Sequence, residues 1–155
     1  MFNLSAHYVP ASGPANSASQ ILFANDGKRL FASIKGAPGA PGFIAAWNVN
    51  DDGSLSENFE KNTPQGGGAL PFSMTLIRGG KDAILNTDPA LGFSVYDFEG
   101  DIKADSDKGT TIEGQGAACW SEFSDVTKNY YITDIKTRYA LSESGTPIAP
   151  SSLCF

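Results

Sequence analysis

The fold class of this chain is decided by a stretch near its start, Gln20-Ile21-Leu22-Phe23-Ala24-Asn25-Asp26-Gly27-Lys28-Arg29-Leu30-Phe31-Ala32-Ser33-Ile34. Two apolar runs flank an Asp-Gly pair, an arrangement that strongly favours a β-hairpin. A Gly/Pro-rich loop follows at residues 36–42, then an apolar run at 43–49, a turn at Asp52-Gly53 and a short run at 54–56. These residues together predict a unit of several antiparallel strands.

The same order of runs recurs twice further along the chain. The second unit has runs at 73–77, 83–87 and 92–98, and the third has runs at 118–123 and 130–135. A shift of 53 residues places Phe31 on Ile84, and a shift of 46 places Thr87-Asp88 on Thr133-Asp134. A shift of 49 places the run at 47–49 on the run at 96–98. The chain therefore contains about three related units.

A repeat of roughly 45–50 residues with several strands in each unit is typical of propeller blades. No apolar stripe of helical period extends beyond two turns, because glycine or proline interrupts each candidate. We therefore predict an all-β fold, a partial β-propeller with about three blades of antiparallel meander. Closed propellers typically have 4–8 blades, so three units do not close a ring. An independent β-sandwich is the alternative that this length permits.

The chain divides into three predicted segments. Residues 1–18 form an irregular lead-in, residues 19–138 form about three blades, and residues 139–155 form a divergent C-terminal tail. An open array leaves apolar side chains of its terminal blades exposed to water. The residues expected to be exposed in this way are Phe23, Phe31, Trp47, Trp120, Tyr130 and Ile132. We expect self-association through the open blade edges.

Composition narrows the classes of partner. The 155 residues carry a net charge of −6 and no cluster of lysine and arginine, which argues against nucleic acid because phosphate binding needs a basic patch. No stretch approaches the ~20 apolar residues of a membrane-spanning helix. The first residues show neither a basic region nor an apolar run, so we expect no signal peptide in this sequence.

Metal and cofactor chemistry have little support in the sequence. Cys119 and Cys154 lie far apart, without a CxxC pair or a nearby histidine, so we expect no zinc site. The sequence is compatible with a disulfide between these two cysteines and, alternatively, with two free thiols. His7, the single histidine, lies in the lead-in, which leaves no Ser-His-Asp arrangement. We expect no cofactor.

Arg78, Asp88 and Asp134 are the candidate catalytic residues. Asp88 and Asp134 occupy matching positions after predicted inner strands, where strand ends of a propeller face the channel and bind ligands. The Arg78 guanidinium is suited to hold a substrate carboxylate through two hydrogen bonds. The alternative is structural: each aspartate binds turn amides, and the arginine lies exposed on a hairpin. If they form a site, both carboxylates point toward a common channel, with Thr87 and Thr133 alternating away.

Several segments resemble one family. They are residues 21–36, Gly42-Phe43-Ile44-Ala45-Ala46-Trp47, Leu70-Pro71-Phe72-Ser73-Met74 and Gly114-Gln115-Gly116-Ala117-Ala118-Cys119-Trp120-Ser121. Across roughly residues 19–137 the chain is similar to fungal 3-carboxymuconate cyclase-like proteins, which are seven-bladed propellers of the lactonase type. The resemblance implies a protein more than twice this long, often secreted and therefore extracellular, with blades on both sides of this segment.

The chain departs from that family in three respects. From the given sequence we expect no leader and about four blades fewer than in that family, and residues 139–155 no longer look like a blade. The family's acidic and basic residues do not map onto particular positions here, so none is carried over.

Three functional hypotheses follow. The first is an enzyme, an intramolecular lyase (isomerase) or lactonase, that closes or opens a lactone on a small carboxylated substrate. The second is a non-catalytic secreted propeller that acts as an antigen or binding module, which the shortage of acid–base pairs favours. The third is a truncated product without activity. Turnover of muconolactone distinguishes the first from the others.

Overall fold

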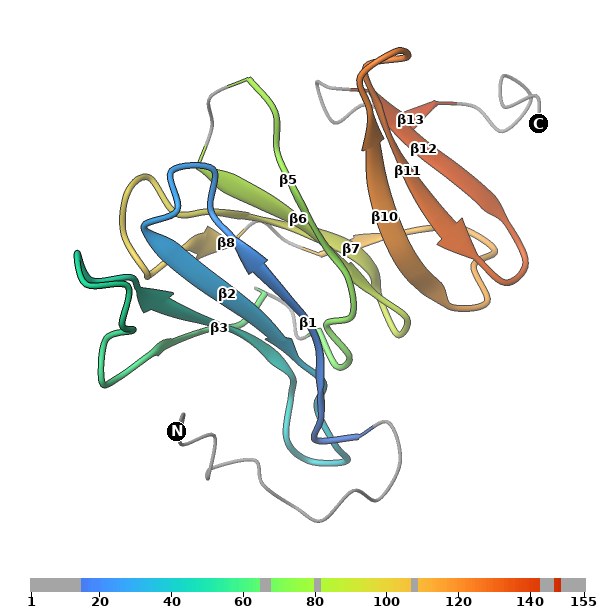
Figure 1. Ribbon diagram of the computed structural model, residues 1–155. Coiled ribbons are helices and arrows are strands. Elements are labelled where there is room, and N and C mark those ends of the chain that lie inside the picture. The colour runs from blue at the N-terminus through green and yellow to red at the C-terminus, as the bar shows by residue number, and fades with distance from the viewer. Residues whose placement is uncertain (1–14, 65–67, 80–81, 107–108, 143–146, 149–155) are drawn as a thin grey trace.

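The computed structural model describes residues 15–64, 68–79, 82–106, 109–142 and 147–148, and these residues form three antiparallel sheets (Figure 1). The first sheet, blade 1, contains β1 (Ala18–Phe23), β2 (Arg29–Ile34), β3 (Phe43–Asn48) and β4 (Glu60–Asn62). Blade 2 contains β5 (Met74–Leu76), β6 (Ala83–Asp88), β7 (Gly92–Asp97), β8 (Asp105–Ser106) and β9 (Thr110–Thr111). Blade 3 contains β10 (Ala118–Ser124), β11 (Asn129–Asp134), β12 (Arg138–Ser142) and β13 (Pro147–Ile148).

Each sheet is a meander, in which every strand pairs with the next one in the sequence. The one addition is β9, which pairs with β7 beside β8. Sheets of about four antiparallel strands that follow one another along the chain are the units of a propeller. The predicted all-β fold of about three blades is therefore confirmed.

The hairpin between the first two strands of a blade follows from local turn chemistry. In blade 1, Gly27 has a φ of +70°, which glycine adopts at little cost, and its amide bonds the carbonyl of Ala24 at 3.0 Å. The Asp26 carboxylate accepts a hydrogen bond from the Lys28 amide at 2.9 Å. In blade 3 the turn of residues 125–128 uses Lys128 at a φ of +58°. A shift of 53 residues also places Gly27 on Gly80, but Gly80 lies outside the described residues.

Strand alternation gives each blade two faces, and blade 2 packs one of them against blade 1 and the other against blade 3. The cluster between blades 1 and 2 comprises Ala24, Phe31, Ile44, Ala46, Met74, Ile84, Tyr96 and Phe98. The cluster between blades 2 and 3 comprises Leu85, Phe93, Ile112, Ala118, Phe123, Tyr130, Ile132 and Leu141. The hydrophobic core therefore lies between the sheets.

The first strands of the three blades lie next to one another. Gln20 on β1 clamps the backbone of Met74 on β5: its amide nitrogen donates to the Met74 carbonyl at 3.0 Å, and its carbonyl accepts from the Met74 amide at 2.7 Å. In the same way, the Thr75 hydroxyl on β5 donates to the Ser121 carbonyl on β10 at 2.9 Å. Side chains thus join backbones of neighbouring blades.

The strand registers correct one repeat alignment. Phe23 pairs with Leu30 in blade 1 and Leu76 pairs with Ile84 in blade 2, so Leu30, and not Phe31, corresponds to Ile84. The cause is the hairpin of blade 2, which is one residue longer. Trp47 pairs with Leu30 and Tyr96 with Ile84, which confirms the shift of 49.

Several strands differ from the sequence prediction. The run at 54–56 contributes only an isolated bridge between Val49 and Leu55, and the outer strand β4 comes later. The short strands β8 and β9 carry little apolar pattern and were not predicted. Beyond residue 138, where the blades were expected to end, β12 pairs along β11 and β13 pairs with β12. The third sheet therefore continues to residue 148.

Most side chains that an open array was expected to expose are buried. Phe31, Tyr130 and Ile132 lie in the clusters between blades. Trp47 lies on the open face of blade 1, where Phe59 covers it at a ring-centroid distance of 5.0 Å. Only Phe23 and Trp120 of the expected set are exposed. The prediction was wrong for the other four for two reasons. Phe31, Tyr130 and Ile132 lie on faces that meet a neighbouring blade, and a loop that carries Phe59 covers Trp47.

Candidate functional site

A cavity of about 600 Å³ lies at one end of blade 1. The loop between β2 and β3 forms one wall and the segment that leads into β5 forms another. Its lining residues are Ala15, Gly36, Ala37, Pro38, Gly39, Ala40, Pro41, Gly68, Ala69 and Leu70. A volume of this size suits a small molecule. The lining contains no ionisable side chain, so the cavity offers backbone groups and apolar surface.

Two glycines let the walls of this cavity meet. A Cβ atom on Gly36 would lie 2.5 Å from the carbonyl oxygens of Ala40 and Ala69, and one on Gly42 would collide with the ring of Pro71. The Gly36 amide donates to the Ala69 carbonyl at 2.8 Å, which ties the two walls together. Within the loop, Ala37 and Ala40 bond each other's backbone in both directions, at 2.8 and 2.9 Å.

Asp88 holds the wall formed by residues 68–70 from inside the protein. Its side chain is fully buried at the end of β6. One carboxylate oxygen accepts the Leu70 amide at 2.9 Å, and the other accepts the Ala90 amide at 2.9 Å. The ideal Cβ position of Gly68 is 2.8 Å from the same carboxylate, so only glycine fits there without displacement. Asp88 therefore positions the wall and does not face the cavity.

Asp134 has the equivalent place in blade 3. Its carboxylate accepts the amides of Gly116 at 3.0 Å and Ala117 at 2.7 Å, in the segment that leads into β10. It also accepts the amides of Lys136 and Thr137. Burial by itself raises the pKa of Asp134, but these four amides more than offset it and hold the pKa well below its ordinary value. A carboxylate stabilised in this way is a weak base.

Arg78 does not join the two aspartates. It lies exposed at the hairpin between β5 and β6, whereas Asp88 lies at the far end of β6, roughly 20 Å away along a six-residue strand. The Arg78 guanidinium lies 5.4 Å from the ring centroid of Phe123, and its backbone amide donates to the Tyr130 hydroxyl at 2.7 Å. The structure thus places Arg78 at the other end of its blade from Asp88, and both aspartates bind backbone amides.

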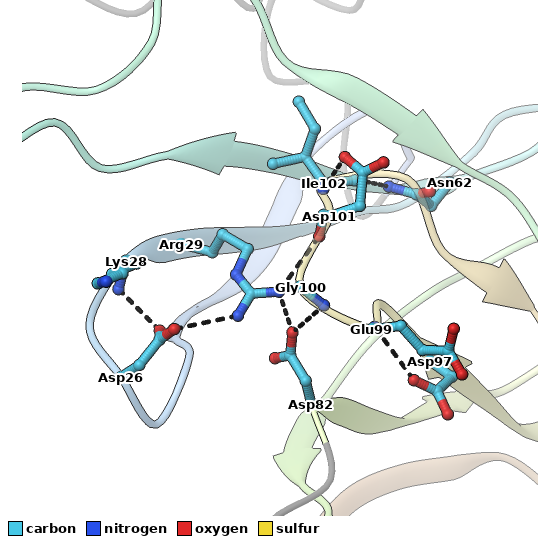
Figure 2. A network of polar contacts seen from close by, with 10 residues as sticks. All are labelled: Asp26, Lys28, Arg29, Asn62, Asp82, Asp97, Glu99, Gly100, Asp101 and Ile102. Carbon is cyan, nitrogen blue, oxygen red and sulfur yellow. Dashed lines mark hydrogen bonds and ion pairs between the residues drawn. The ribbon is translucent and has the colours of Figure 1, made fainter.

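A polar network that the sequence did not point to joins blades 1 and 2 (Figure 2). The buried Arg29 guanidinium on β2 contacts the carboxylate of Asp82, which precedes β6, and donates to the Asp101 carbonyl at 3.2 Å. It also pairs with Asp26 at 3.2 Å. Asp82 in turn accepts the Gly100 amide at 2.9 Å. The sequence alone does not indicate that Arg29 is buried; the fold shows it.

Close to this network, a hollow of about 320 Å³ is lined by Asp97, Phe98, Glu99, Asp101, Lys103 and Asp105.

Among the described residues, no group of three or more His, Cys, Asp or Glu side chains is placed to hold a metal ion. No helix in the described part of the chain is long and apolar enough to cross a membrane. Cys119 is a free thiol, while Cys154 and His7 lie outside the described residues.

Blade 2 also buries polar atoms on the face that it turns toward blade 1. The side chains of Asn86, Ser94 and Tyr96 have buried polar atoms without a hydrogen-bond partner among the described residues. Burial raises the pKa of the Tyr96 hydroxyl, and the nearby negative charge of Asp88 raises it further. Asn86 and Ser94 are directly opposite each other on β6 and β7. The alternation of strand residues is enough to place Asn86, Ser94 and Tyr96 on one face of the sheet, but it does not show that they are buried.

Comparison with known proteins supports the fold. A gluconolactonase from Xanthomonas campestris has a similar structure, with a TM-score of 0.52 and 19% sequence identity. The match covers 76% of this chain and 34% of the gluconolactonase, so this chain corresponds to about a third of that protein. No protein-family model matches the sequence, and no curated protein matches it. The architecture is therefore that of a partial β-propeller, similar to that of a propeller lactonase.

Proposed function

We propose that this chain is part of a lactonase-type propeller and that its described blades bind a small lactone. The observation that carries the proposal is the cavity between the Gly36–Pro41 loop and the Gly68–Leu70 segment. It lies at the end of the blades where Asp88 holds the segments between blades in place. An apolar wall with exposed backbone groups suits a neutral ring better than a highly charged chain.

The cation nearest in sequence to this wall is Lys35, which directly precedes Gly36. Its ammonium group lies over the ring of Phe72, 5.2 Å from the centroid. A lactone that also carries a carboxylate would gain from this charge at the edge of the cavity. The preferred ligand class is therefore a small lactone with one carboxylate, such as muconolactone.

Binding is better supported than catalysis. The cavity lining brings no acid or base to a bound ring. Asp88 is buried behind the wall, Asp134 is committed to four amides, and Arg78 lies at the opposite end of its blade. Lactone opening or closing requires a positioned proton donor or acceptor. A binding module is therefore the favoured form of the proposal, and lactone-forming or lactone-opening activity, including isomerase chemistry of the carboxymuconate cyclase type, is the second candidate.

Titration calorimetry with muconolactone tests the proposal. The Ala40→Leu variant fills the cavity and is expected to weaken binding at least tenfold, which corresponds to about 1.4 kcal/mol. Ala90→Leu is the matched control, because Ala90 is exposed in the corresponding loop of blade 2 and does not line the cavity. Equal affinity in both variants would contradict the proposed site.

Ultraviolet absorbance on the same samples separates the two candidates. Binding without loss of muconolactone supports the binding module. Turnover above the buffer rate by folded protein supports the enzyme, and we expect it to fall with Ala40→Leu. Neither binding nor turnover would favour a product without activity.

A further inference from the structure

Three polar side chains lie together inside the interface between blades 1 and 2. Asn86 on β6 and Ser94 on β7 are directly opposite each other, and Tyr96 is the next residue of β7 on the same face. This face packs against blade 1, since Tyr96 belongs to the hydrophobic cluster between the two blades. Asn86 and Tyr96 are 0% exposed and Ser94 is 1% exposed. These three residues, the polar row, are therefore closed off from bulk solvent.

The polar row carries four polar atoms without a hydrogen-bond partner among the described residues. They are the amide nitrogen and oxygen of Asn86 and the hydroxyl oxygens of Ser94 and Tyr96. Asn62, a second buried amide of the same interface, is fully paired: it donates to the Ile102 carbonyl at 2.9 Å and accepts the Ala104 amide at 2.8 Å. Burying an unpaired polar group costs free energy, so folded proteins pair nearly all of them, either with protein groups or with ordered water.

The fold does not require polar residues at these positions. Leu30 corresponds to Ile84, so Ala32 of blade 1 has the place of Asn86, and the shift of 46 gives that place to Ile132 in blade 3. Ala45 faces Ala32 across the strands as Ser94 faces Asn86. Ala32, Ala45 and Ile132 are apolar and buried. The polar row therefore belongs to blade 2 in particular and needs a reason of its own.

The geometry of the polar row leaves its groups close to one another but not joined. Directly opposite residues of an antiparallel pair have Cβ atoms about 4.5–5.5 Å apart, yet the Asn86 amide and the Ser94 hydroxyl do not bond each other. Burial raises the pKa of Tyr96, and the negative charge of Asp88 raises it further. Asp88 lies beyond the Asn86–Ser94 pair along the same strands, so the phenol extends toward that pair.

The chemistry of the polar row selects the ligand. The amide of Asn86 offers two donors and one acceptor, and each hydroxyl offers a donor and an acceptor. A ligand held by this set must itself donate and accept hydrogen bonds, which an ion cannot do. It must also be small and neutral, because the surrounding cluster is apolar. Water meets all of these conditions.

We propose that ordered internal water occupies the interface between blades 1 and 2, bound to the amide of Asn86 and the hydroxyls of Ser94 and Tyr96. A buried water makes about three hydrogen bonds, so four unpaired atoms suit one or two molecules. Proteins hold about one buried water per 27 residues, which is about six in a chain of 155. One or two at the polar row are in proportion, and they do not depend on the binding of a lactone.

Nuclear magnetic resonance of the unmodified protein tests the proposal without any substitution. Magnetisation is transferred from water to the side-chain amide protons of Asn86, in the laboratory and the rotating frame. A water that stays bound for longer than the protein tumbles gives signals of opposite sign in the two experiments, whereas hydrogen exchange gives the same sign. We expect opposite signs at Asn86. Folded protein without a through-space signal from water at this amide would overturn the proposal.

Oxygen-17 relaxation dispersion of the solvent, which counts long-lived internal waters, gives a second readout. Asn86→Leu replaces the amide with a larger apolar side chain and is expected to lower the count by one or two molecules. Asn48→Leu is the matched control, because Asn48 is exposed at the end of β3, and it is expected to leave the count unchanged. Circular dichroism checks that both variants are folded. An equal count in folded Asn86→Leu and in the unmodified protein would also overturn the proposal, and the Asn86 signal decides the matter if that variant does not fold.

Discussion

The guanidinium of Arg29 in blade 1 contacts the carboxylate of Asp82 in blade 2, across the interface between the two sheets (Figure 2). Arg29 is buried, and the side chain of Asp82 is 26% exposed. The same guanidinium donates to the Asp101 carbonyl, so two segments of blade 2 depend on one side chain of blade 1. A buried charge of this kind is costly when its partner is removed.

Asp82→Ala is therefore expected to lower the free energy of unfolding by about 2 kcal/mol. The loss leaves the Arg29 guanidinium without its main partner and frees the Gly100 amide. Urea denaturation measures it. Asp26→Asn is the control, because the side chain of Asp26 is 45% exposed and a surface pair contributes about 0–1 kcal/mol. Equal losses in the two variants would contradict the structural role of the pair between blades.

The hydroxyl of Thr87 bridges blades 2 and 3. Thr87→Val keeps the shape of the side chain but leaves the Ser73 amide and the Cys119 carbonyl without this partner. Because Thr87 is fully buried, we expect a loss of about 2 kcal/mol in thermal or urea unfolding. Thr111→Val, on the exposed strand β9, is the matched change and is expected to cost under about 0.5 kcal/mol.

Asp134 makes the stability of the chain depend on pH. Its pKa is lower in the folded protein than the ordinary value of 3.8 that we expect in the unfolded chain. The stabilisation is therefore complete above that unfolded value and is lost as the pH falls through the folded pKa. We expect Asp134→Asn to be less stable than the unmodified protein at pH 7, by about 1–2 kcal/mol, and the difference to shrink in acid. A difference that stays constant from neutral pH into acid would show that the amides do not favour the charged form.

Gly36 controls the shape of the cavity. Gly36→Ala introduces a Cβ atom 2.5 Å from three backbone atoms, so the walls must separate. We expect a loss of about 3 kcal/mol in stability and weaker binding of muconolactone. Gly39→Ala is the control in the same loop: it meets no atom within 4 Å, and its φ of +81° alone costs about 1 kcal/mol. Similar stability of the two variants would show that the walls do not meet at Gly36.

The sequence was sufficient for the fold class because the hairpin signals are local. Asp26-Gly27 forms the expected turn, and the apolar runs of all three units become paired strands. Short outer strands such as β8 and β13 have two residues each, which is too few for an alternating pattern. Their positions depend on pairing with a neighbouring strand, and that information is not local.

The candidate site was harder to predict for the same reason. Asp88 and Asp134 do occupy matching positions, and both bind amides of the turn that follows them, as the structural alternative expected. Their other amide partners come from segments about 18 residues earlier in the chain, which the sequence did not indicate. The cavity has no charged side chain to mark it in the sequence. Its Gly, Ala and Pro residues are typical of an ordinary loop, and only the contact of Gly36 with Ala69 shows that they line a common hollow.

Backbone amide NMR during titration with muconolactone tests the central claim most directly, because it locates the ligand on the protein. The account predicts that the largest shift changes occur at Ala37, Gly39 and Ala69, which line the cavity. It predicts little change at Arg78 or in the acidic hollow of residues 97–105. Changes centred on either of those places, or no change at saturating ligand, would contradict the assignment of a lactone site to this end of the blades.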